Sequence, residues 1–210
     1  PKGEWFWEYS DNDLNQIDDA ETIRDHMLRA IFGSFANAKK NPKYAPNRLK
    51  WVAYIGGKRE TRRLMGDHIY DMHDAVKRRE FQDAVVVEKR EVDGHYQRKL
   101  KGAKEDFLST AMFHKTGGYY YIPFRSFYSR NLSNLMMAGR CFSCTHVGLC
   151  GPRVMNTCGQ MGIATGFAAV LCKKHGANPK QVGKLHIKEL RSLIGFGNKK
   201  LVNNPSKGGH

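Results

Sequence analysis

The residues best suited to chemistry lie in one loop, residues 139–155, which holds a histidine, two arginines and three cysteines. His146 and Arg153 have side chains that can polarise a carbonyl group or pair with a carboxylate, although either can instead simply brace the loop. A Gly- and Ala-rich run then begins near Asn156 and predicts a helix. Its first turn would offer unpaired N–H groups to an anionic or electron-rich group. The loop and the helix start therefore predict an anion or cofactor site.

A second group of charged residues follows the apolar run 49–55, which predicts a strand. This strand would deliver Arg59, Glu60, Arg62 and Arg63 to a loop. A guanidinium group can fork onto a substrate carboxylate, so we select Arg59 and Arg62 as candidate substrate contacts. A salt-bridged turn is the alternative, and the pattern does not divide roles among the arginines.

Among the sequence patterns, several cysteines most resemble a metal-binding motif, because thiolate ligands often come as C-x2-C pairs. Only one such pair is present and the spacings that follow it are irregular, so we expect no metal. His68, His73 and Asp74 match no closed site either. The cysteines and histidine concerned are Cys141, Cys144, Cys150, Cys158 and His146.

Read as whole motifs, these stretches resemble the FAD-dependent oxidoreductase family related to fumarate reductase-like flavoproteins. The likeness covers nearly the whole chain, and no single motif carries it. Its segments are AGRCFSCTH (138–146) and RVMNTCGQMGIATGFAAVL (153–171), similar to the family's last flavin-contacting segment, YYYIPFRSFYSRNLSNLMMAGR (119–140), similar to its strand and PxRS turn, and IGGKRETRRLMGDH (55–68), similar to its GxRExRRxxGD motif.

The resemblance implies FAD as the cofactor and hydride transfer between the flavin and a small-molecule substrate, for which the arginines suggest a carboxylate. It implies that N–H groups at the helix start bind the pyrimidine edge of the flavin ring, and that the segment at 138 passes the ribityl and pyrophosphate region. Cys144 and Cys150 depart from the family's usual Ala and Gly, which leaves the loop's shape open. The implied cofactor contacts are Ala138, Gly139, Arg140, Cys141, Val154, Met155, Asn156 and Thr157.

The GxGxxG fingerprint that holds the ADP part of FAD in this family is absent from the sequence, which starts at Pro1 without a Met. We therefore expect the C-terminal part of a longer flavoprotein, or one half of a split one. The expected partner is the missing N-terminal nucleotide-binding half, in the same chain or as another subunit. Without that half, the small-residue face of helix 156–172 should be an exposed apolar patch.

The expected fold class is α/β, as the C-terminal portion of an FAD/NAD(P)-binding-type flavoprotein with a mixed sheet in its substrate-side region. Three segments are expected: an incomplete substrate-side domain (1–117), the last flavin-binding strand, loop and helix (118–176), and a packing helix with a tail (177–210). The local patterns predict helices at 19–38, after Asp71 or Asp74, and from 178, and strands at 83–92 and 135–138.

The net charge of +15 raises a rival function, a basic module that binds single-stranded nucleic acid. Trp5, Trp7 and the tyrosine run 119–121 would supply the stacking rings. The basic residues are dispersed among acidic ones, however, so we interpret them as solvated faces and expect no nucleic acid. No run approaches the roughly 20 apolar residues of a membrane span, so we expect no membrane. A non-catalytic flavoprotein partner subunit is a third alternative.

Overall fold

The computed structural model describes residues 14–57, 62–99 and 106–197. Contacts divide the chain into two units, residues 1–61 with 95–112 and residues 62–94 with 113–210. The candidate residue Arg59 and the aromatic residues Trp5 and Trp7 lie outside the described residues. All the other candidate site residues belong to the second unit.

The first unit contains helix α1, Ala20–Ala38, which confirms the helix predicted at 19–38. Its N-cap is Asp19, whose side chain makes no capping hydrogen bond. The strand predicted at 49–55 is wrong, because residues 47–57 hold no strand and Trp51 is 79% exposed. An extended segment needs a neighbour to pair with, and the described residues give this one none.

The second unit is organised around strand β1, Ala84–Glu88, which pairs antiparallel with β4, Tyr120–Pro123. Val86 lies opposite Ile122, and both side chains are fully buried. The strand predicted at 83–92 is therefore right in its first half only. Strand β1 ends at Glu88. The next strand, β2, Val92–Lys99, pairs with β3, Asp106–His114, and not with β4.

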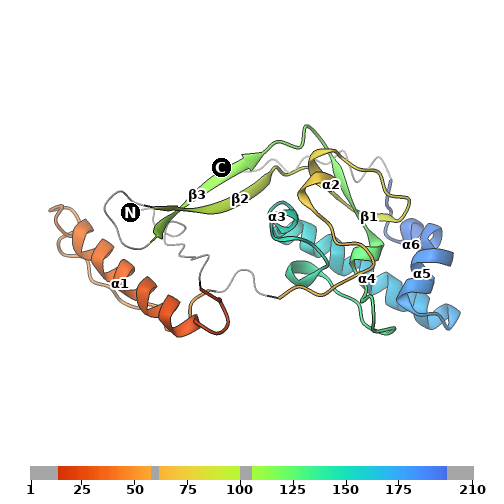
Figure 1. Cartoon of the computed structure of the whole chain (residues 1–210), viewed down its shortest axis with the longest axis horizontal. Helices are drawn as coiled ribbons and strands as arrows, with labels where there is room; N and C mark the ends of the chain where they lie inside the picture. Colours follow the sequence, from red (N-terminus) through yellow and green to blue (C-terminus); the bar gives the residue numbers. More distant parts are fainter. Residues whose placement is uncertain (1–13, 58–61, 100–105, 198–210) are drawn as a thin grey trace. The chain divides into compact units, whose positions relative to one another are not determined.

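The fold is mixed α/β, but the sheets are smaller than expected (Figure 1). In the described part of the chain each sheet has two strands, so the predicted mixed sheet is not found there. Among the residues that the structure describes, parallel pairing is limited to an isolated bridge between Tyr70 and Cys144. The strand predicted at 135–138 is reduced to a bridge between Tyr128 and Met136. The chain turns immediately after 138, which leaves no room for a longer ladder.

In the second unit, one helix packs on β1 and another on β4, and the remaining helices pack on these two. The expected cap at Asp71 is confirmed, since Asp71 and Asp74 form a capping box. The helix predicted from 178 is interrupted at His186, which ends one helix and begins the next. None of the described helices is long and apolar enough to cross a membrane. The helices are α2 (Met72–Val76), α3 (His146–Leu149), α4 (Met155–His175), α5 (Pro179–Leu185) and α6 (Ile187–Leu193), with the short 3-10 turns η1 (Phe124–Ser126) and η2 (Gly139–Cys141).

Helix α4 is apolar on both faces but buries only one of them. The buried face packs on β1 and the helices that follow. The opposite face, called here the open face, is made of Gly159, Gly162, Ile163, Gly166, Phe167 and Val170, all exposed in the chain. The structure thus confirms an exposed apolar patch on the small-residue side of this helix. The buried residues of α4 are Thr157, Met161, Ala164, Ala168 and Leu171.

Candidate functional site

The start of α4 presents free backbone donors. The helix begins at Met155 rather than at Asn156, because Val154 is extended (φ −72°, ψ 150°) and forms the N-cap without a side-chain cap. The first helical bond joins the Cys158 N–H to the Val154 carbonyl at 2.9 Å. The N–H groups of Met155, Asn156 and Thr157 donate to no acceptor among the described residues. These donors can hold the electron-rich edge of a ligand.

The turn η2 lies against this helix start. Gly139 has φ +70°, a conformation that side chains disfavour, and a Cβ there would lie 3.9 Å from both Cβ and Sγ of Cys158. Ala138 is extended, and its carbonyl accepts a hydrogen bond from the Cys141 thiol at 3.5 Å. Arg140 is exposed. The structure therefore brings the two segments predicted to contact a cofactor, 138–141 and 154–157, side by side.

Two polar contacts anchor α4 to β1, and the sequence analysis missed both. Thr157 donates a hydrogen bond to the Glu88 carboxylate, which places a negative charge beside the positive end of the helix. The Gln160 amide bonds both backbone groups of Val87, accepting from its N–H at 3.1 Å and donating to its carbonyl at 3.0 Å. The one local sequence signal for these contacts was an acidic residue, Glu88, at the end of an apolar strand.

His146 is the first residue of α3, where Thr145 caps the helix by accepting from the Gly148 N–H. The residue is exposed, but partial desolvation of its ring and then the Arg63 guanidinium lower the pKa of His146. The imidazole is therefore neutral at neutral pH, able both to accept and to donate a hydrogen bond.

Arg63, rather than Arg62, is the arginine that acts on His146. Its Nε donates to the Cys144 carbonyl at 2.8 Å, which holds the guanidinium beside the loop. Arg62 is exposed at the start of the second unit. The sequence pattern contained all of these arginines but could not separate them, because the distinction depends on a contact 81 residues away.

Arg153 is held by a carboxylate. Its Nη2 donates to the Asp93 carbonyl at 3.1 Å and to the Asp93 carboxylate at 3.2 Å, in a partly buried pair. Arg125 on η1 is likewise paired with Asp83, with 3.6 Å between Nε and Oδ1. The pair with Asp93 favours the bracing alternative for Arg153.

The five cysteines, all among the described residues, form no disulfide. Burial raises the pKa of Cys144 to about 12, so this thiol stays protonated at neutral pH. Among the described residues, the loop cysteines and His146 make no group of three ligand atoms close enough to share a metal. His68 is partly buried, and its Nε2 lies 2.7 Å from Oδ2 of buried Asp74.

Nearly the whole chain matches one family model. The model of the FAD dependent oxidoreductase family matches residues 3–194. Comparison with curated proteins and with solved structures found no match. The family match agrees with the motifs at 55–68, 119–140 and 138–171, which come from separate parts of the chain. This chain belongs to the FAD-dependent oxidoreductase family, a family of flavoproteins with FAD as the cofactor.

Proposed function

We propose that this chain supplies the flavin-ring contacts and the substrate side of an oxidoreductase related to fumarate reductase-like flavoproteins. The reaction is hydride transfer between FAD and a carboxylate-bearing substrate. The observation that carries the proposal is the contact between η2 and the start of α4. When bound, FAD supplies the redox chemistry, since its ring can accept or give a hydride.

The start of α4 fits the electron-rich edge of a flavin ring. Three consecutive N–H groups, from Met155 to Thr157, have no acceptor among the described residues, and the helix adds about half a positive charge at this end. Met155 is 91% exposed, so the first turn is accessible. Gly139 leaves open backbone beside this turn, where Ala138, Arg140 and Cys141 would pass the rest of the cofactor.

The substrate would be held by the loop that carries α3. His146, as a neutral imidazole, would bind a substrate carbonyl or carry a proton at a ring nitrogen. Arg63 lies near it and, with the adjacent Arg62, would bind a carboxylate. Arg153, through its pair with Asp93, keeps the loop in place rather than binding substrate.

The ADP part of FAD needs a separate nucleotide-binding half, because the sequence lacks the GxGxxG fingerprint. We propose that this half, in the same chain or as a partner subunit, docks on the open face of α4. Ile163, Phe167 and Val170 on this face are 54%, 38% and 57% exposed. The glycines between these side chains allow another element to approach closely, and the exposed apolar side chains favour an interaction surface.

The test is the visible absorption spectrum of a protein that contains both halves, with mass identification of what denaturation releases. We expect FAD, and bleaching of the flavin by one of a panel of small carboxylates. His146→Gln should keep FAD but slow bleaching by about 10²–10⁴-fold, the usual contribution of a general acid or base. His73→Gln, an exposed histidine on α2, is the matched control. No flavin in the two-half protein would refute the proposal.

The rival functions predict different results. In the nucleic-acid alternative the tyrosine run would stack on bases, but Tyr120 is fully buried and Lys89 lies over Tyr119 at 5.4 Å. That alternative requires steeply salt-dependent oligonucleotide binding. A non-catalytic partner subunit would retain FAD that no substrate bleaches, and His146→Gln would then change nothing.

A further inference from the structure

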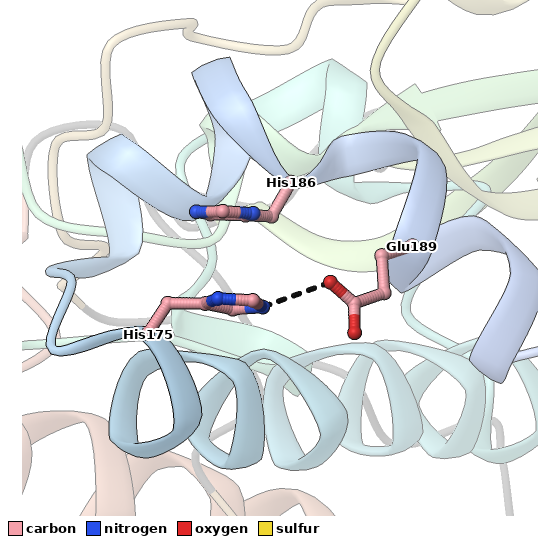
Figure 2. Close-up of side chains that lie close together, drawn as sticks. All are labelled: His175, His186 and Glu189. Carbon is pink, nitrogen blue, oxygen red and sulfur yellow. Dashed lines mark hydrogen bonds and ion pairs between the residues drawn. The ribbon is translucent and has the colours of Figure 1, made fainter.

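Three side chains with metal-binding chemistry meet at the C-terminal end of α4. His175 is the last residue of α4, His186 joins α5 to α6, and Glu189 lies in the first turn of α6. Figure 2 shows the two imidazole rings stacked face to face, with the carboxylate directed toward the lower ring. The ring centroids are 3.9 Å apart, and Nε2 of His175 lies 2.9 Å from Oε2 of Glu189.

The three residues offer one ligand atom each, all within 4.8 Å of one another. Two imidazoles and one carboxylate are a donor set that suits zinc and similar divalent ions. We propose that His175, His186 and Glu189 bind one divalent transition-metal ion of the zinc type, with water completing the coordination. The site is distinct from the loop at 139–155 and does not depend on the proposed function.

The backbone around the cluster is well fixed. Gly176 ends α4 in the left-handed conformation (φ +59°), and the N–H of Ala177 returns to the Cys172 carbonyl at 3.0 Å. Asn178 and Gln181 then form a capping box that sets the start of α5. The three ligands therefore project from a defined helix–turn–helix frame, which favours a metal site over a chance encounter of mobile chains.

The side chains themselves still have room to adjust. An ion bound to both imidazoles must lie in the plane of each ring, so at least one of the stacked rings must turn about its Cβ–Cγ bond. His186 can do so, because its ring makes no hydrogen bond to the other described residues and is only partly buried. Zinc–nitrogen bonds of about 2.0–2.1 Å then require the more distant ligand atoms to move toward one another by ~1 Å or more.

One ammonium group shares the carboxylate of the cluster. Lys174 Nζ lies 2.7 Å from Oε1 of Glu189, and His175 holds the other oxygen. A metal ion would replace the His175 contact at Oε2 and leave Oε1 with Lys174. It would link the end of α4 to α6.

Titration of the full chain with Co²⁺ tests the site, because cobalt reports its ligands in the visible spectrum. We expect one equivalent to bind with ligand-field bands and without the charge-transfer absorption that thiolate ligands produce. His175→Gln, His186→Gln and Glu189→Gln should each weaken binding by at least ~10-fold, since even outer-shell changes cost that much. His73→Gln, an exposed histidine elsewhere, should change nothing.

Lys174→Ala gives a test that does not depend on deleting a ligand. Removing the ammonium group that shares the carboxylate should strengthen Co²⁺ binding several-fold, whereas a purely structural salt bridge predicts no gain. Circular dichroism checks that each variant is folded. Absence of binding, binding through thiolates, or equal affinity in the wild-type chain and the three ligand variants would overturn the proposal.

Discussion

Replacing Gly162 on the open face of α4 by alanine tests whether that face is free in this chain. A Cβ at Gly159, Gly162 or Gly166 would meet nothing within 4 Å, and none of the three has a positive φ. The substitution therefore adds helix propensity without a clash, which is worth about 0.8–1.0 kcal/mol. We expect Gly162→Ala to raise the free energy of unfolding by ~1 kcal/mol, and the double variant with Gly159→Ala by ~2 kcal/mol.

The assay is urea unfolding followed by circular dichroism, where the midpoint should rise with an unchanged slope. Ala169→Gly, an exposed position on the same side of α4, is the mirror control and should lose ~1 kcal/mol. A Gly162→Ala variant that is less stable than the wild type would refute the reasoning, because it would mean that another part of the chain packs on this face.

The same substitution has the opposite effect if the nucleotide-binding half docks on the open face. The added methyl group would then occupy space that a neighbouring element needs, so the two-half protein should retain less FAD although this chain is more stable. Unchanged FAD content in Gly159→Ala/Gly162→Ala would contradict docking on this face. That result would not contradict the proposed FAD contacts at the start of α4.

Three further predictions concern stability. Gly66→Ala should cost about 2–3 kcal/mol in urea unfolding, because its Cβ would lie 2.6 and 3.0 Å from two backbone carbonyl oxygens. Gln160→Leu should cost about 1–3 kcal/mol in the same assay, since it leaves both backbone groups of Val87 without the amide. Burial alone would raise the pKa of Asp74, but hydrogen bonds from His68 and from the backbone lower it below the ordinary value of 3.8. Its contribution to stability is therefore present above that value and lost as the pH falls below it, which acid titration of the unfolding free energy would detect.

Each of these has its own control. Gly57→Ala, where a Cβ meets nothing within 4 Å, should be nearly neutral, and equal effects at the two glycines would contradict the packing argument. Gln160→Glu keeps an acceptor for the Val87 N–H but loses the donor to the Val87 carbonyl, so it should destabilise as well, and unchanged stability in both variants would contradict the role of the amide. Asp74→Asn should flatten the acid part of the stability profile, and an unaltered profile would show that another carboxyl group controls it.

Local sequence was sufficient where one segment carries its own signal. The helix predicted at 19–38 matches α1, Ala20–Ala38, to within one residue. The small-residue run fixed α4 and its apolar character on both faces. The family, too, followed from motifs in the sequence, since these are identities of residues rather than contacts.

Tertiary structure decided what depends on partners distant in the chain. The apolar run 49–55 has strand propensity but finds no strand to pair with among the described residues, so it stays irregular. Arg153 is 60 residues from Asp93 and Gln160 is 73 residues from Val87, separations that no local period reveals. The meeting of η2 with α4, and of His175 with Glu189, likewise comes from packing. The sequence by itself determined which chemical groups the chain contains. The tertiary structure decided which of these groups lie close together, because burial and hydrogen bonding act between segments that are distant in the chain, and a local sequence period describes each segment alone.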